Sequence, residues 1–150
     1  MRVLMGSDER TPLTDAVAGA LREGGHELTL VGPVAGGEEE WADVGAEVGR
    51  RVAAGEGERG VLFCWTGTGV SIAANKVPGV RAALCGDAET AAGARTWNDA
   101  NVLALSLRAT SIPIAKAMLD AWFGAAPTTD PKYAAMIEQI QSADLPVNRT

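Results

Sequence analysis

A cysteine followed by a glycine-rich turn is the feature of this sequence best suited to chemistry. Cys64 ends an apolar run, and residues 65–69 after it read WTGTG before a helical pattern begins. A thiol beside a helix N-terminus is placed where its pKa can fall, so a thiolate could form near neutral pH. The alternative is that Cys64 is a small buried hydrophobe, which is how we interpret Cys85.

The two glycines of this turn favour binding of an anion by backbone amides. Gly67 and Gly69 let the main chain approach a ligand closely and direct several N–H groups toward one point, which suits an oxyanion or a phosphate. The dinucleotide-binding fingerprint requires a third glycine, and Ile72 stands in its place. A nicotinamide or flavin site is therefore the less favoured interpretation.

Polar residues follow the first apolar run, where a strand would end. Ser7, Asp8, Glu9 and Arg10 stand there. Because ligands of open parallel sheets bind beyond the carboxyl ends of the strands, we expect these groups at the same edge as Cys64, where they could orient hydroxyl groups. The alternative is an ordinary polar turn that caps the following helix.

Further positions bear on ligand binding. Arg108 follows the last predicted strand on the side of Cys64 and could pair with a phosphate, with a solvated surface arginine as the alternative. Trp97 and Asn98 precede that strand. His26 precedes the second strand at the opposite edge, and we expect it to be structural or exposed.

Five short apolar runs alternate with longer amphipathic stretches. The runs predict strands at Arg2–Met5, Glu27–Val31, Gly60–Cys64, Val80–Cys85 and Asn101–Ser106. The longer stretches predict helices at Pro12–Glu23, Glu38–Ala54, Ala88–Trp97 and Ile112–Phe123, and a last helix near Pro131–Gln141. This alternation predicts an α/β fold in which helices cover both faces of a parallel sheet, as one domain spanning residues 1–150.

Charge and hydropathy exclude several classes of partner. The formal net charge is −6, and the 13 basic residues form no continuous run, so we expect no nucleic-acid partner. No apolar stretch approaches the roughly 20 residues that span a bilayer. The chain starts with a strand pattern instead of a signal segment, and its two cysteines end strand-like runs, which together predict a reduced, cytoplasmic setting.

Several ordered motifs resemble the type B ribose-5-phosphate isomerases and the related galactose-6-phosphate isomerases. The resemblance covers about residues 1–125. The matching segments are Gly6–Asp8, Cys64–Gly69, Ser71–Lys76, Gly79–Ala82 and Asn98–Ala104. Their shared order makes the set far more specific than any single motif, so the resemblance favours a catalytic Cys64.

The resemblance implies a Rossmann-like three-layer α/β/α sandwich with a five-stranded parallel sheet. It also implies a homodimer or homotetramer with the site at the subunit boundary, where the C-terminal helix could pack on the partner. The implied reaction is aldose–ketose isomerisation without metal or other cofactor, in which a base moves a proton between C1 and C2 through a cis-enediolate.

The resemblance also assigns roles to residues. Cys64 would be the base, Thr66 and Asp8 would handle hydroxyl protons, and Asn98 would hold the sugar. The amides expected to form the anion hole are those of Gly67, Thr68, Gly69, Val70 and Ser71. The side chains expected around the substrate are Ser7, Glu9, Trp65, Trp97 and Asn98.

The sequence departs from the family pattern in three ways, of which the first concerns two positions. Glu9 and Trp97 stand where the family usually has histidines, the second of which is its ring-opening acid, and Trp65 replaces the glycine after the cysteine. The usual C-terminal Gly-Gly-Arg-His and a trailing arginine are absent, and residues 128–133 occupy that stretch.

The phosphate ligands are affected as well. Arg108 matches a family arginine, whereas Arg10 and Lys132 are substitutes that we infer from their positions.

These departures favour a small substrate that is already an open chain. A furanose must open before C1 can react, and neither Trp97 nor Glu9 supplies an imidazole. A tetrose 4-phosphate cannot form a furanose through its blocked O4, and two tryptophans near the pocket predict a smaller cavity. We therefore expect a sugar phosphate such as a tetrulose 4-phosphate, with ribose/ribulose 5-phosphate next. The alternatives are a sugar- or nucleotide-binding protein on the same scaffold and a nucleotide-dependent redox domain.

Overall fold

Within residues 1–144, which the computed structural model describes, five short strands form one parallel sheet. The strands are β1 (Arg2–Ser7), β2 (Glu27–Val31), β3 (Arg59–Cys64), β4 (Ala82–Leu84) and β5 (Val102–Ser106), in the order β2-β1-β3-β5-β4. Every neighbouring pair is parallel, which confirms the predicted sheet. β4 is shorter than the predicted run Val80–Cys85, because the Val80 amide donates to Val77 in a turn and the Arg81 amide donates to the Asn101 side chain.

Alternate residues of the central strands enter two separate cores. In β3, Val61 and Phe63 pack on one face, and Leu62 and Cys64 pack on the other. Successive side chains of a strand point to opposite faces, so a run that is apolar at every position requires helices on both sides. The continuous apolar run that ends at Cys64 is explained by this double burial.

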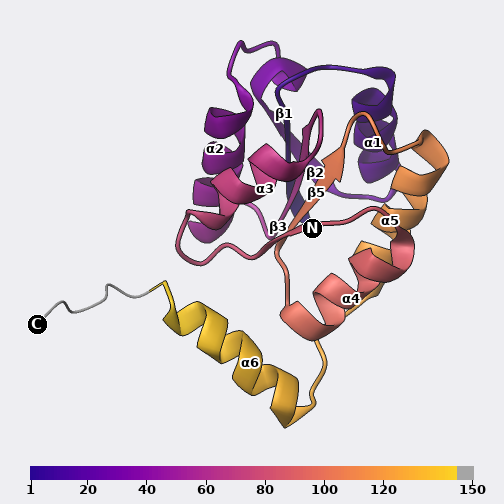
Figure 1. Cartoon of the computed structure of the whole chain (residues 1–150). Coiled ribbons are helices and arrows are strands. Elements are labelled where there is room, and N and C mark those ends of the chain that lie inside the picture. Colours follow the sequence, from indigo (N-terminus) through magenta and orange to yellow (C-terminus); the bar gives the residue numbers. More distant parts are fainter. Residues whose placement is uncertain (145–150) are drawn as a thin grey trace, which may run out of the picture.

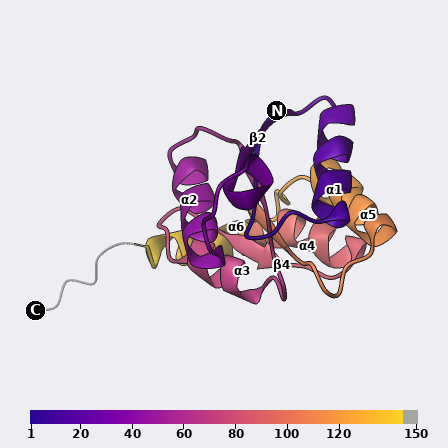
Figure 2. The ribbon, with the colours of Figure 1, turned by 90° about the horizontal axis from the view of Figure 1, so that it is seen from above.

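The helices supply the two covering layers (Figure 1). They are α1 (Pro12–Glu23), α2 (Trp41–Ala53), α3 (Thr68–Asn75), α4 (Ala88–Asn98), α5 (Ile112–Gly124) and α6 (Pro131–Ser142), with a 3₁₀ turn η1 (Gly32–Ala35). Seen from above, α2 and α3 lie on one side of the strands, and α1 and α5 lie on the other (Figure 2). This arrangement confirms the predicted Rossmann-like three-layer sandwich. α2 begins at Trp41 instead of the predicted Glu38, with Glu40 as its N-cap.

The first helix shows why these sequences form helices where they do. Thr11 accepts a hydrogen bond from the Thr14 amide, and the Thr14 side chain accepts one from the Thr11 amide, which closes a capping box before Pro12. Leu13, Val17 and Leu21 follow at helical spacing and are all buried. The start predicted at Pro12 is therefore confirmed.

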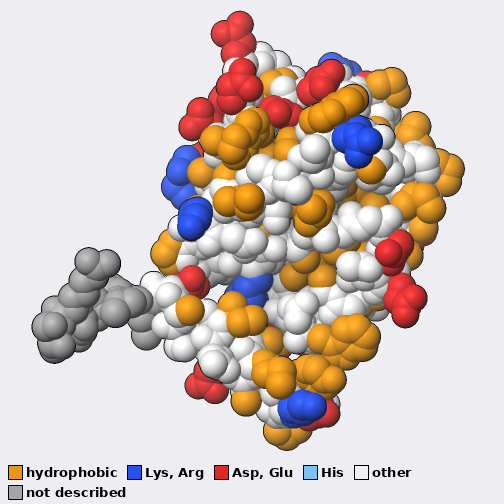
Figure 3. Space-filling model, viewed as in Figure 1, with side chains coloured by type: hydrophobic (Ala, Val, Ile, Leu, Met, Phe, Trp, Pro, Cys, Tyr) orange, Lys and Arg blue, Asp and Glu red, His pale blue; other side chains and the backbone are white. Residues whose placement is uncertain are grey.

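The last helix, α6, lies below α4 in Figure 1, and the Asp144 side chain shortly after it accepts a hydrogen bond from the Gly79 amide at 2.7 Å. No side chain of α6 is buried, and Met136 and Ile140 are 46% and 50% exposed. The space-filling view shows hydrophobic atoms at the surface in this region (Figure 3). None of the helices in residues 1–144 is long and apolar enough to cross a membrane.

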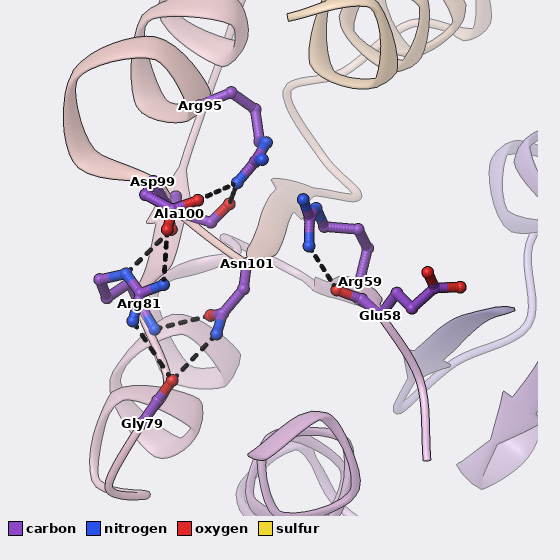
Figure 4. A network of polar contacts seen from close by, with 8 residues as sticks. All are labelled: Glu58, Arg59, Gly79, Arg81, Arg95, Asp99, Ala100 and Asn101. Carbon is purple, nitrogen blue, oxygen red and sulfur yellow. Dashed lines mark hydrogen bonds and ion pairs between the residues drawn. The ribbon is translucent and has the colours of Figure 1, made fainter. Parts of the chain in front are cut away.

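A polar network fixes the edge of the sheet opposite the carboxyl ends of the strands (Figure 4). The Asp99 carboxylate accepts hydrogen bonds from Arg95 at 2.8 Å and from Arg81 at 3.3 Å. The Asn101 side chain accepts from the Arg81 amide and donates to the Gly79 carbonyl. Four residues of the matching motifs therefore hold the start of β4 and β5 in place.

Removing the central carboxylate of this network is expected to destabilise the fold. Asp99→Ala leaves the Arg95 guanidinium, which is 4% exposed, without its counter-charge. Breaking a largely buried ion pair by removing one partner costs roughly 3 kcal/mol. Urea unfolding measures the effect, with Asp15→Ala as the matched control, because Asp15 pairs with Arg10 at the surface and should contribute about 1 kcal/mol or less. Equal losses in both variants would contradict the structural role of Asp99.

Candidate active site

Cys64 is the last residue of β3, and its side chain faces the layer formed by α2 and α3. It is 4% exposed and borders a cavity of about 480 Å³ at the carboxyl edge of the sheet. The cavity is lined by Asp8, Trp41, Cys64, Trp65, Thr66, Thr68, Gly69 and Ile72. The thiol is thus a buried group with a ligand-sized space beside it, and the predicted grouping of Asp8 and Thr66 around it is present.

The turn between β3 and α3 requires glycine at its bend. Gly67 has φ +76°, a left-handed conformation, and its amide donates to the Cys64 carbonyl at 3.2 Å. A Cβ at this position would lie 2.8 Å from the Leu105 carbonyl carbon. The backbone of the site is therefore pressed against β5, which fixes the start of α3 beside Cys64.

The turn offers fewer backbone amides to an anion than the five that the sequence predicts. The Gly67 amide is occupied by Cys64, and the Ser71 amide donates to the Gly67 carbonyl at 3.3 Å as the first bond of α3. The amides of Thr68, Gly69 and Val70 occupy the first three positions of the helix, where N–H groups lack a carbonyl partner within the helix. These three donors, together with the positive end of the helix dipole, are available for an anion.

The two threonines of the turn are joined by a hydrogen bond. The Thr66 and Thr68 hydroxyl oxygens lie 2.7 Å apart, and both residues line the cavity. Because each hydroxyl can both donate and accept a hydrogen bond, the pair can pass a proton from one threonine to the other.

Asp8 follows β1 directly and brings a half-buried carboxyl group into the cavity. Burial raises the pKa of Asp8 above its usual value, and the carboxylates of Glu40 and Glu9 raise it further, against the lowering effect of a backbone hydrogen bond. A raised pKa brings a carboxyl group closer to neutral pH, where a group that both donates and accepts protons works best.

The raised pKa of Asp8 predicts a pH-dependent effect on stability. The ionised carboxylate opposes folding at pH 7, whereas protonation below its unfolded pKa removes this cost. Asp8→Asn should therefore raise the free energy of unfolding at pH 7, and the gain should shrink as the pH falls toward about 3.5. Urea unfolding of both proteins at the two pH values tests this, and a gain that is the same at both would contradict it.

Trp41 is a cavity residue that sequence reasoning missed. It is the first residue of α2 and is 44% exposed, and a Cβ on Gly69 would lie 2.7 Å from its Cε3 atom. The indole therefore fills the space that the absent Gly69 side chain leaves. Ile72, one turn along α3, also lines the cavity, and Trp65 does so at 62% exposure.

Several predicted site residues have structural roles instead. Ser7 is fully buried, where its hydroxyl donates to the Glu9 carbonyl at 2.6 Å and accepts from the Glu9 amide, so it holds the turn after β1. Glu9 is exposed outside the cavity lining. The Val70 side chain is fully buried in the core between α3 and the sheet. Ser7 and Glu9 are therefore not among the residues that line this cavity, and their contact with a substrate stays a prediction.

The predicted phosphate ligands are dispersed. Arg10 pairs with Asp15 at 2.9 Å and lines a different cavity, and Lys132 on α6 lies over the Tyr133 ring. Neither side chain lines the Cys64 cavity of its own chain, and phosphate binding by Arg10 and Lys132 stays a prediction. The Arg108 amide donates to the Trp65 carbonyl at 3.0 Å, so Arg108 adjoins the site turn through its backbone.

Trp97 and Asn98 lie at the end of α4 in a second cavity, of about 450 Å³, together with Cys85. The Trp97 indole packs on Gly93, and Cys85 is buried in the core on the α1, α4 and α5 side. Burial, and secondarily the nearby Asp87 carboxylate, raises the pKa of Cys85 to about 11. Within one chain, the tryptophans that line the Cys64 cavity are Trp41 and Trp65, and the place of Trp97 near the substrate stays a prediction.

In the part of the chain that the structure describes, the Cys64 cavity includes neither His26 nor a cluster of metal-binding side chains. His26 stacks on Phe123 at 4.3 Å between ring centroids, away from the Cys64 cavity, which agrees with the structural expectation. Residues 1–144 hold no cluster of three or more histidine, cysteine or acidic side chains that could bind a metal ion.

The family described as Ribose/Galactose Isomerase matches residues 3–140. The chain belongs to the ribose/galactose isomerase family. The solved structure of ribose-5-phosphate isomerase B from Clostridium thermocellum is similar to it with a TM-score of 0.88 and 36% identity, covering 96% of this chain and 97% of that one.

Two curated relatives show how much of the chain can be aligned in sequence, and at what identity. Ribose-5-phosphate isomerase B of Escherichia coli (strain K12) is 46% identical over 80 residues, covering 53% of this chain and 54% of that protein. D-erythrulose-4-phosphate isomerase of Pectobacterium atrosepticum is 41% identical over 85 residues, covering 57% of this chain and 56% of that protein. The chain thus spans about half the length of these curated relatives.

Proposed function

We propose that this protein is an aldose–ketose isomerase of a small, open-chain sugar phosphate, with a tetrulose 4-phosphate as the first candidate. The observation that carries the proposal is the cavity that places the Cys64 thiol beside Asp8, Thr66 and the free amides of α3. A base, hydroxyl-proton carriers and an oxyanion site are the groups that this reaction needs.

The proposed reaction uses these groups in one sequence. The Cys64 thiolate removes the proton from C1 of the ketose, and the electron pair of that C–H bond forms the enediolate double bond between C1 and C2. Amides of Thr68 and Gly69 stabilise the negative oxygen. Asp8 and Thr66 move the hydroxyl proton between O1 and O2, and the Cys64 thiol then returns its proton to C2.

The substrate's length is inferred from the groups that the site does not contain. A ring-opening acid has no candidate imidazole, because His26 lies away from the cavity. A four-carbon 4-phosphate needs no ring opening, and one relative is named a D-erythrulose-4-phosphate isomerase. Ribose/ribulose 5-phosphate is the second candidate, supported by the ribose-5-phosphate isomerase B relatives.

We also propose that a second copy of the chain completes the site. Trp97, Asn98 and the exposed apolar residues of α6 lie outside the Cys64 cavity of their own chain. In a homodimer, or a homotetramer built from dimers, Asn98 of one copy would hold the sugar in the cavity of the other. Arg108 beside the site turn is the proposed phosphate ligand.

A panel of substrates tests the function. Isomerisation of C4, C5 and C6 sugar phosphates is followed in coupled assays with the purified full chain. We expect the highest kcat/KM with a four-carbon substrate. Rates no higher than the uncatalysed background with every phosphate tested would overturn the isomerase proposal. The alternative would then be a binding protein on the same scaffold.

A further inference from the structure

The packing of α2 against α3 places Trp41 beside the site turn. Gly45 and Gly49 stand one and two turns after Trp41, on the same face of α2. A Cβ at Gly45 would lie 2.8 Å from the Val70 carbonyl oxygen, and one at Gly49 would lie 3.1 Å from Val77. Glycine at positions 45 and 49 therefore lets the backbone of α2 come close to α3 and the turn after it, which brings the Trp41 indole against Gly69.

The part of the indole that faces the turn cannot form hydrogen bonds. The atoms within 3.0 Å of the position of a Gly69 Cβ are Cε3, Cδ2 and Cζ3, which are all ring carbons. Gly69 also supplies one of the free amides at the start of α3. A ligand oxygen bound by that amide is therefore next to an apolar surface.

Apolar side chains make up a further part of the cavity wall. Trp65 and Ile72 line the cavity with Trp41, and the polar side chains of the lining are Asp8, Cys64, Thr66 and Thr68. An additional CHOH unit in the substrate would bring a hydroxyl group against this wall, where it would lose hydrogen bonds to water and gain none. Such a mismatch disfavours the longer substrate in the transition state as well as in binding.

We propose that Trp41 is the specificity-determining residue that limits the substrate to a four-carbon chain. This inference rests on the proposed isomerase function and adds to it the side chain that sets chain length. Trp41 would discriminate against five-carbon substrates in two ways. Its ring occupies volume, and its ring carbons lie where the extra hydroxyl group of a longer sugar needs a hydrogen-bond partner.

The test compares kcat/KM for a tetrulose 4-phosphate with kcat/KM for ribulose 5-phosphate. Trp41→Ala should shift this ratio toward the five-carbon substrate by about 10-fold to 100-fold, because it removes the wall and opens space for water. Trp41→Phe keeps an aromatic ring over Gly69 and should give a smaller shift. Ile114→Ala on α5 is the control for loss of an exposed apolar side chain, since Ile114 is 44% exposed like Trp41, and it should leave the ratio unchanged.

A second readout covers variants that turn over too slowly to assay. The four-carbon and five-carbon phosphorylated aldonohydroxamates imitate the enediolate, and their dissociation constants can be measured by calorimetry on Trp41→Ala and Trp41→Phe. The ratio of the two constants should shift in the same direction as the kinetic ratio.

The outcomes separate the two proposals. Activity of the native protein on neither substrate would overturn the isomerase function. Activity with a ratio that Trp41→Ala and Trp41→Phe both leave within twofold of the native value would overturn the role of Trp41 alone. An unchanged ratio of hydroxamate dissociation constants would overturn that role as well.

Discussion

Replacing Cys64 with alanine is expected to lower kcat for sugar-phosphate isomerisation by about 10²–10⁴-fold, the usual contribution of a general base. The sulfur is the group in the cavity that accepts the carbon-bound proton in the proposed reaction. Cys64→Ser is expected to fall in the same range, because a hydroxyl of similar size ionises far less readily than a thiol. Steady-state kinetics with the preferred phosphate measure both variants.

Cys85 provides the matched control for this experiment. It is buried on the opposite face of the sheet, and its pKa of about 11 keeps it protonated at neutral pH. Cys85→Ala should therefore change kcat by no more than about twofold. A Cys64→Ala protein that folds normally and keeps the native rate would remove Cys64 from the mechanism.

Gly67→Ala is the second change with a large expected effect. A Cβ there would lie 2.8 Å from the Leu105 carbonyl carbon, and the residue would have to keep a φ of +76°. Strain of this kind costs of order 1–3 kcal/mol, and its relief would move the start of α3 away from Cys64. We expect lower stability together with a loss in kcat of about 10²-fold, since a shift near 1 Å at a reacting group has that effect.

Gly19→Ala is the control for adding a methyl group to a glycine. Gly19 lies within α1, and a Cβ there meets no atom within 4 Å. Alanine favours helices, so this variant should gain about 0.5–1 kcal/mol in stability and keep the native kcat. Thermal unfolding and kinetics on both variants measure the contrast, and a Gly67→Ala protein as stable and active as the native one would contradict the description of the turn.

The sequence predicted the parts of the fold that depend on local patterns. The alternation of apolar runs and amphipathic stretches predicted the parallel sheet, and Thr11 with Pro12 predicted the start of α1. Residues 64–69 predicted the strand, turn and helix start around Cys64, because a bend with positive φ requires glycine locally. These features are set within a few residues along the chain.

Other parts of the site depend on contacts between distant segments, which local patterns do not reveal. Trp41 reaches the cavity only because α2 packs closely on α3, where its ring lies against Gly69. In the sequence, the glycine at position 69 indicates a close approach but does not say which residue makes it. Ser7 resembled a ligand residue, but its hydroxyl is consumed by the turn after β1. Arg10 and Lys132 were placed by element order alone, and side-chain partners direct both elsewhere.

The proposed function depends on one step, in which Cys64 moves a proton between two neighbouring carbons of a bound sugar phosphate. Incubation of the purified protein with a tetrulose 4-phosphate in D₂O, followed by NMR, measures exchange at C1 and C2 directly. We predict deuterium at these carbons with the native protein and with Cys85→Ala, and none above background with Cys64→Ala. Binding of the sugar phosphate with no exchange in the native protein, or equal exchange in Cys64→Ala, would contradict the claim.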